Sequence, residues 1–164
     1  MIFTIKMKWL PLWFILLSPA LLSAQKKVII ENEPLVLVNG FKTNLNSLII
    51  NPASIDSMQV LNDSLKTLPY GLEGKNGVIN ISSKKTARLL TAKDILYQYK
   101  IAAKDSNLRF AINKVVVKDA DKILIEQSEI FTVNITKDVI WVNAEDANAG
   151  ERFINITTQS VKNN

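Results

Sequence analysis

The apolar positions in the first half of the chain form short strand-like runs, separated by signals for turns and helix starts. Asn51 is a good N-cap and Pro52 suits the first helical position, so a helix of one to two turns is predicted there. Asp63 predicts a second short helix, which Pro69 limits before a glycine-rich segment. The predicted strands are Leu35–Asn39, Leu48–Ile50, Gln59–Leu61 and Val78–Ser82.

The second half opens with a segment of helical periodicity. Thr91 and Asp94 have the form of a capping box, and apolar residues recur at helical spacing as far as Lys104. One amphipathic helix is therefore predicted over 91–104. The remainder is rich in β-branched and aromatic residues, which favour strands. The predicted strands are Arg109–Val117, Ile123–Ile125, Phe131–Ile135, Val139–Val142 and Phe153–Thr157.

The two halves resemble each other when the chain is compared with itself at a shift of 75 residues. Before the first loop the shift is 74 residues, because that loop differs by one residue between the halves, and Asn39 then matches Asn113. We interpret the match as an internal duplication; chance resemblance between β-rich segments is the alternative. The second copy is expected to keep its strands and lose its glycine turns, because the matched positions there are not glycine. The matches include Val78–Ser83 with Phe153–Thr158, Gly40 with Lys114, Gly71 with Asp146, Gly74 with Ala149 and Gly77 with Arg152.

The first 24 residues have the form of a secretory signal peptide. Lys6 and Lys8 precede an apolar run of about 14 residues that Pro11 and Pro19 interrupt, and the segment ends in Ala24-Gln25. A membrane-spanning helix needs about 20 apolar residues, so an uncleaved anchor is the weaker interpretation. We expect residues 1–24 to be removed, leaving an exported protein with no integral membrane span.

The composition restricts the classes of function. Of 164 residues, 48% are hydrophobic and 21% charged, which is typical of a globular protein. The chain has no cysteine and no histidine, which argues against zinc sites and against Ser-His or Cys-His catalysis. No cluster of Lys and Arg longer than a pair remains after the leader, so nucleic-acid binding is not expected. No cofactor is expected either.

The first half also carries a specific motif. It runs from a strand ending in Asn-Gly through an Asn-Pro-x-x-Ile segment to Tyr-Gly-x-x-Gly-x-Asn-Gly-Val-Ile, and it resembles the plug domain of SusC/RagA-type TonB-dependent receptors. The motif residues are Asn39, Gly40, Asn51, Pro52, Asp63, Tyr70, Gly71, Gly74, Asn76 and Gly77. The resemblance implies a plug fold and an outer-membrane uptake context.

The chain departs from such receptors beyond the motif. A 22-stranded barrel at about 10 residues per strand needs more than about 200 residues, and far fewer follow the plug motif here. We therefore expect a standalone plug-like module without a transmembrane barrel. We find no convincing TonB box in Gln25–Glu33, so direct energy coupling is not expected.

Other chemical patterns are weak. The three glycines of the Tyr70–Gly77 segment fit neither phosphate-binding glycine pattern, so a structural loop is favoured. Ser82 and Lys85 match Ser-x-x-Lys, but the companion elements of penicillin-recognising enzymes are absent. Asp119 and Asp121 begin like a calcium loop that lacks its glycine and distal glutamate, which favours a polar turn.

These observations predict an α+β fold of two plug-like α/β units joined by an amphipathic helix. The predicted divisions are a signal peptide over 1–24, a plug-like unit over 25–85 and a degenerate second unit over 86–164. The predicted function is that of a non-catalytic binding or adaptor protein in the periplasm or at the outer membrane, with the glycine loop facing its partner. The expected partner is an outer-membrane barrel receptor or a surface lipoprotein. The alternatives are a structural or regulatory envelope module without a transport role and a Ser-Lys hydrolase using Ser82 and Lys85.

Overall fold

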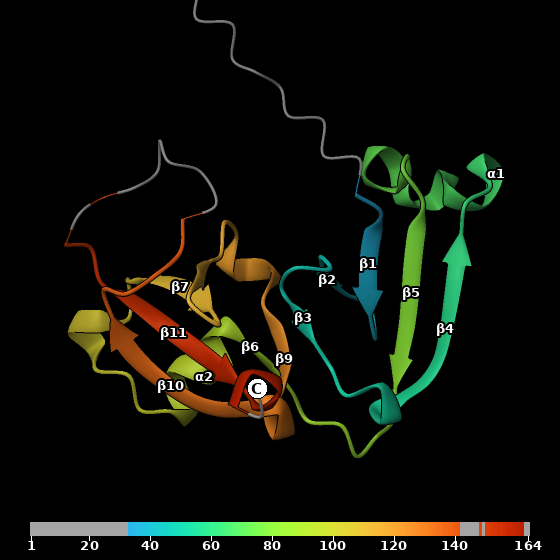
Figure 1. Cartoon of the computed structure of the whole chain (residues 1–164). Coiled ribbons are helices and arrows are strands. Elements are labelled where there is room, and N and C mark those ends of the chain that lie inside the picture. Colours follow the sequence, from blue (N-terminus) through green and yellow to red (C-terminus); the bar gives the residue numbers. More distant parts are fainter. Residues whose placement is uncertain (1–32, 142–147, 149, 163–164) are drawn as a thin grey trace, which may run out of the picture. The chain divides into compact units, whose positions relative to one another are not determined.

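The structure, a computed structural model, describes residues 33–141, 148 and 150–162. These residues belong to one compact unit, Asn32–Asn164, of mixed α/β structure in which strands predominate over a few short helices (Figure 1). The predicted signal peptide 1–24 lies outside the described residues. Within the described ranges, no helix is both long and apolar enough to span a membrane.

The first sheet contains four strands from the half that carries the motif. These are Leu35–Val38 (β1), Phe41–Thr43 (β2), Ile55–Leu61 (β4) and Val78–Ser83 (β5). The strand order is β2-β1-β5-β4. The central strands β1 and β5 are parallel, and each edge strand is antiparallel to its neighbour. In Figure 1, β1, β5 and β4 lie side by side in this order.

The second sheet has the same arrangement in the other half. Its strands are Arg109–Ile112 (β7), Val115–Val116 (β8), Ile130–Thr136 (β10) and Phe153–Thr158 (β11), in the order β10-β11-β7-β8. The central pair, β7 and β11, is again parallel and the edge strands are antiparallel. The antiparallel edge pair also has an irregular register at the same place in both sheets. The register shifts between Ile55 and Ser57 in the first sheet and between Ile130 and Thr132 in the second.

A third, smaller sheet joins strands from both halves. It consists of Leu48–Ile49 (β3), Leu124–Glu126 (β9) and Leu89–Thr91 (β6), in the order β3-β9-β6. Strand β3 pairs in parallel with β9, with Leu48 opposite Leu124. The two halves that the sequence comparison matched are thus linked by backbone hydrogen bonds.

The helices are short. The α-helices are Ser64–Thr67 (α1), Ala92–Gln98 (α2) and Gln159–Lys162 (α3). The 3-10 helices are Pro52–Ser54 (η1), Leu68–Gly74 (η2), Ala103–Asp105 (η3), Ala120–Lys122 (η4) and Gln127–Glu129 (η5).

The predicted amphipathic helix begins where expected but ends early. The capping box of Thr91 and Asp94 is confirmed, with hydrogen bonds in both directions. The helix was expected to reach Lys104, but α2 ends at Gln98 and Lys100 adopts φ 51°. The N–H of Ile101 donates to the carbonyl of Leu96 at 3.0 Å, which closes a Schellman motif. A lysine holds the position that usually carries glycine, so no stop signal could be recognised at this end of the helix.

Three other element boundaries differ from the expectation. The helix expected after Asn51 is a single 3-10 turn, and the chain is already extended from Ile55, because β4 pairs with β5 along its length. The strand expected over 109–117 is the hairpin of β7 and β8. In place of a strand over 139–142, Ile140 makes an isolated bridge with Val115, and residue 142 lies outside the described residues. Strands β2 and β6 were not predicted.

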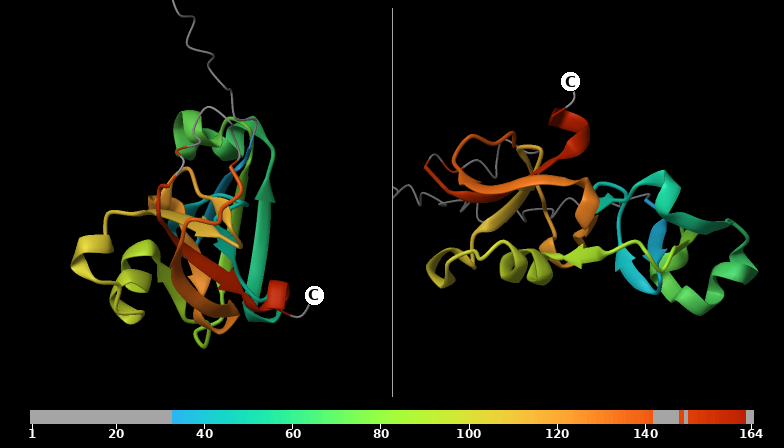
Figure 2. Two further views of the ribbon diagram at one scale, coloured as in Figure 1. Left: turned by 60° about the vertical axis from the view of Figure 1, so that its left-hand side comes forward. Right: turned by 90° about the horizontal axis from the view of Figure 1, so that it is seen from below.

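The larger core cluster lies between the second sheet and the segment before it. Its members come from β6, α2, β7, β9, β10 and β11 and include Ile123, which directly precedes β9. In the right-hand view of Figure 2, α2 lies on one side of β10 and β11. A smaller cluster on the first sheet contains Val36, Val38, Ile81 and Leu124. A third, on the other side of the second sheet, contains Ala111, Val116 and Phe153.

Candidate functional site

The Asn-Gly pair of the motif forms the two-residue turn between β1 and β2. Asn39 and Gly40 have φ of 50° and 84°, as a type I′ hairpin turn requires. The Asn39 side chain reaches across to the end of β5, where its Oδ1 accepts from the Ser83 N–H at 3.0 Å and its Nδ2 donates to Ser83 Oγ at 2.7 Å. The turn therefore also fixes the end of the parallel neighbour strand.

The second half has the same kind of turn, with the same asparagine hydrogen bonds, at the hairpin of β7 and β8. Asn113 and Lys114 have φ of 51° and 69°. The Asn113 Oδ1 accepts from the Thr158 N–H at 2.9 Å, and its Nδ2 donates to Thr158 Oγ1 at 3.0 Å. The expectation that this turn would be lost without glycine was therefore wrong. The Lys114 N–H donates to Asn155 Oδ1 at 2.8 Å, which helps to hold the left-handed backbone.

Replacing either turn asparagine with alanine should destabilise the chain. We expect Asn39→Ala to lower the free energy of unfolding by about 1 kcal/mol and Asn113→Ala by about 2 kcal/mol, because the bonds of Asn113 are less exposed to water. Urea denaturation of purified protein measures both. The exposed Asn107→Ala is the control; losses no greater than that of the control would contradict a role of these asparagines in holding the strand ends.

Lys114 offers an opposite prediction. A non-glycine residue in the left-handed region costs about 1–2 kcal/mol, so Lys114→Gly should stabilise the protein by about 1 kcal/mol. Lys114 also pairs with Asp138 on the surface, an interaction of small value. Lys114→Ala removes that pair and keeps the strain, so only the glycine variant should unfold at higher urea concentration. Equal shifts in the two variants would count against backbone strain at this turn.

Asn51 and Pro52 lie at the junction between the halves. Asn51 caps η1 by accepting from the Ala53 N–H at 2.9 Å, as predicted. Its own N–H donates to Glu126 Oε2 at 2.9 Å, and its side-chain amide donates to Glu129 Oε1 at 2.9 Å. Ser54 Oγ donates to Glu126 Oε1 at 2.8 Å. The Asn-Pro turn is thus held by two carboxylates of the second half.

Glu126 is a buried carboxylate that was not predicted as a site residue. Only 6% of its surface is exposed. Burial acts to raise the pKa of its carboxyl group, but hydrogen bonds from the Asn51 N–H and from the Ser54 and Ser128 side chains outweigh it, so the pKa lies below its ordinary value. The signal in the sequence was a charged residue directly after the apolar pair Leu124-Ile125 of a predicted strand.

The remaining motif residues lie at the opposite end of the first sheet. Asp63 caps α1 by accepting from the Leu65 N–H at 2.8 Å, as expected. Pro69, Tyr70 and Gly71 lie in η2, and Asn76 lies in the turn that leads to β5. The motif residues are therefore divided between the two ends of the sheet and do not gather around one cavity.

The glycine segment packs largely against its own sheet. Gly74 is buried, and a Cβ added there would lie 2.8 Å from Tyr70 Cβ. Gly77 is also buried, has φ 99°, and accepts the Leu35 N–H at 3.0 Å. Gly71 is exposed, with φ 60° and open space beside it. Of the three glycines, only Gly71 presents its backbone to solvent.

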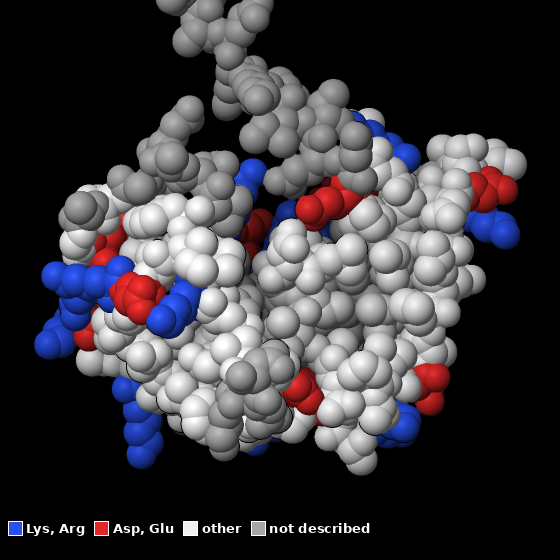
Figure 3. All heavy atoms as spheres, viewed as in Figure 1, with Lys and Arg blue, Asp and Glu red and all other residues white. Residues whose placement is uncertain are grey.

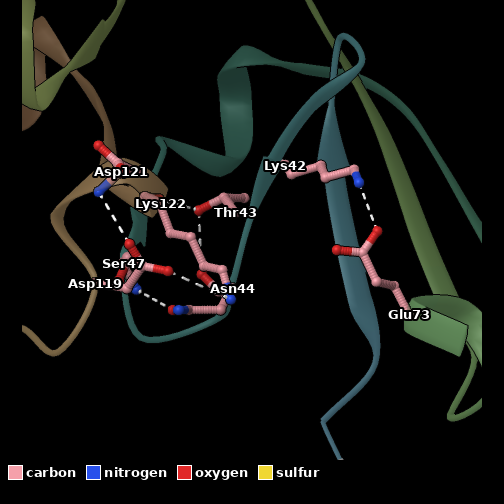
Figure 4. Close-up of polar contacts among 8 residues, drawn as sticks. All are labelled: Lys42, Thr43, Asn44, Ser47, Glu73, Asp119, Asp121 and Lys122. Carbon is pink, nitrogen blue, oxygen red and sulfur yellow. Dashed lines mark hydrogen bonds and ion pairs between the residues drawn. The ribbon is translucent and has the colours of Figure 1, made fainter.

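Polar contacts around β2 connect it to neighbouring elements (Figure 4). Thr43 Oγ1 donates to the Lys122 carbonyl at 2.6 Å, and Asp119 caps η4 by accepting from the Asp121 N–H at 3.1 Å. Lys42 pairs with Glu73 on the surface. The Asp119–Asp121 segment forms the predicted polar turn, and no group of three potential metal ligands occurs in the described ranges. Ser82 is exposed on β5, and its use as a nucleophile stays a hypothesis.

Comparison with known proteins gives one informative match. No protein-family profile and no solved structure matches the chain. Over an alignment of 63 positions, the chain is 39% identical to part of the TonB-dependent receptor SusC of Bacteroides thetaiotaomicron. The chain is similar to a TonB-dependent receptor. The match covers 34% of the chain and 6% of SusC, so the chain spans a small part of that receptor's length.

Proposed function

We propose that this protein is an exported, non-catalytic binding or adaptor protein that works with an outer-membrane TonB-dependent receptor. The similarity to SusC carries the proposal. The ordered motif supports it, because Asn39 holds a strand end of the first sheet, and Asn51 and Asp63 cap the short helices before and after β4. Gly74 and Gly77 leave little room for a side chain. The absence of histidine and cysteine from the sequence supports a role without catalysis.

We further propose that the two sheets are plug-like units related by internal duplication. Two independent features support this: the shared strand order, and the turn asparagine that binds the end of the parallel neighbour strand in each half. In both sheets the antiparallel edge pair has the same register, with Met58 opposite Ile81 and Val133 opposite Ile156. The matching hydrogen bonds support duplication over chance similarity between β-rich sequences.

The test is a crosslinked affinity purification of the tagged protein from the envelope of its own host, with partners identified by mass spectrometry. We expect a TonB-dependent receptor or its surface lipoprotein to be enriched over an unrelated tagged, exported protein. Recovery of a regulator instead would support the structural or regulatory alternative. A protein that crosslinks to no envelope component would overturn the adaptor function.

A further inference from the structure

Two apolar side chains on β4 are exposed although they lie on the core side of the first sheet. Met58 and Val60 are 61% and 53% exposed. They pair with Ile81 and Ile79 of β5 and therefore share a face with them. On that same face, Val36 and Val38 of β1 are buried. The face is covered on its β1 side and uncovered along β4.

The equivalent face of the second sheet is covered. Val133 and Ile135 hold the positions of Met58 and Val60, opposite Ile156 and Ile154. Val133 packs against the larger core cluster, and both isoleucines of β11 are fully buried. The cluster on this face combines residues of β6 and β9 with residues of α2 and the segment after it, which include Ile95, Leu96, Tyr99 and Ile101.

The first sheet lacks such a helical layer among its described neighbours. The cluster on its core side contains residues of β1, β2, β3, β4, β5, β6 and β9, but none from a described helix. Burying an apolar side chain is favourable because it removes apolar surface from water. Two exposed side chains at positions that are covered in the matching sheet therefore mark an incomplete layer.

The near absence of charged residues on β1, β4 and β5 favours an apolar partner surface. Strands β1, β4 and β5 together carry one charged residue, Asp56. In the view of Figure 3, the surface over these strands is largely uncharged, with Lys, Arg, Asp and Glu mostly towards its margins. Such a surface does not attract nucleic acid or an acidic ligand.

We propose that the uncovered core-side face formed by Met58, Val60 and Ile79 binds an amphipathic helix of a partner protein, in the position that α2 occupies on the second sheet. The partner helix presents aliphatic and aromatic residues at the spacing of Ile95, Leu96 and Tyr99, and polar residues on its other side. This inference rests on the proposed binding function and names the element that the partner supplies.

The chain itself provides the probe. A fluorescein-labelled peptide of residues 89–104, stapled between positions 93 and 97, presents the α2 face as a stable helix. Lys93 and Tyr97 are exposed, so the staple leaves the packing residues free. Fluorescence anisotropy with the whole chain should show saturable binding, and the same peptide with Ile95→Asp should not bind.

Variants of β4 locate the site. Met58→Asp and Val60→Asp should each weaken peptide binding at least tenfold, whereas Gln59→Asp, which adds the same charge on the opposite face of β4, should change it less than twofold. Circular dichroism melting establishes that the variants are folded. Absence of saturable binding, or equal effects of the three variants, would overturn the proposal.

Sedimentation distinguishes a second copy from a partner helix. If the chain is a dimer that Met58→Asp converts to a monomer, this face is occupied by a second copy and the partner-helix proposal is wrong. The peptide measurement needs no receptor, so it separates the two ideas. If the peptide binds but no receptor is recovered, only the adaptor function is wrong. If a receptor is recovered but the peptide does not bind, only the proposed helix-binding site is wrong.

Discussion

Replacing Gly74 with valine is expected to lower the free energy of unfolding by about 3 kcal/mol, and replacement with alanine by about 2 kcal/mol. A Cβ at this position would lie 2.8 Å from Tyr70 Cβ, 3.1 Å from the Thr67 carbonyl oxygen and 3.2 Å from Val78 Cγ2. Two of these atoms are held by the backbone, so the strain cannot be relieved by rotating one flexible side chain. The added methyl groups of valine increase the overlap.

Urea denaturation followed by circular dichroism measures this effect. Leu72→Ala in the same 3-10 helix is the control, because Leu72 is 87% exposed and should tolerate truncation. Gly74→Ala and Gly74→Val proteins as stable as the control would show that the glycine is not required for packing. A receptor-binding test in this loop is better made at the exposed Leu72, because Gly71 has φ 60° and a side chain there would strain the backbone.

Replacing Glu126 with alanine is expected to cost about 3 kcal/mol of unfolding free energy. The carboxylate accepts from the Asn51 N–H and the Ser54 hydroxyl, and both donors lose their partner when it is removed. A donor left without an acceptor near the interior costs about 1–3 kcal/mol. Glu129→Ala removes one bond to the Asn51 side chain and should cost about 1 kcal/mol.

The matched control is Glu73→Ala, which removes an exposed carboxylate paired with Lys42 and should lower the free energy of unfolding least of the three variants. In urea denaturation at pH 7, the loss of unfolding free energy should be largest for Glu126→Ala, smaller for Glu129→Ala and smallest for Glu73→Ala. If Glu126→Ala is no worse than Glu73→Ala, the carboxylate does not hold the Asn51 turn.

Glu126 also makes the stability of the folded chain depend on pH. Because the pKa of Glu126 is lower in the folded chain than in the unfolded one, its stabilisation is present above the unfolded pKa of about 4.5. It is lost as the pH falls from there through the folded pKa. The stability difference between the wild type and Glu126→Gln should therefore shrink between pH 5 and pH 3. A constant difference across that range would contradict the assignment.

Local signals predicted the elements whose start is fixed by a single side chain. Asn51, Asp63 and Thr91 all cap the helices that the sequence assigned to them. The ends were predicted less well, because Lys100 and Lys114 adopt left-handed backbone without being glycine. The conformation of Lys114 is held by a hydrogen bond to Asn155, which is distant along the chain and does not enter a residue's own backbone propensity.

The sequence by itself determined most of the strands, the helix caps, the match between the two halves, and a motif that resembles TonB-dependent receptor plugs. These features depend on neighbours close along the chain or on residue identity. Only the tertiary structure placed Glu126 beneath the Asn51 turn and left Met58 exposed while Val133 is covered. Burial and partner choice depend on which distant segment packs over a strand, and the pattern of the strand alone does not specify that segment.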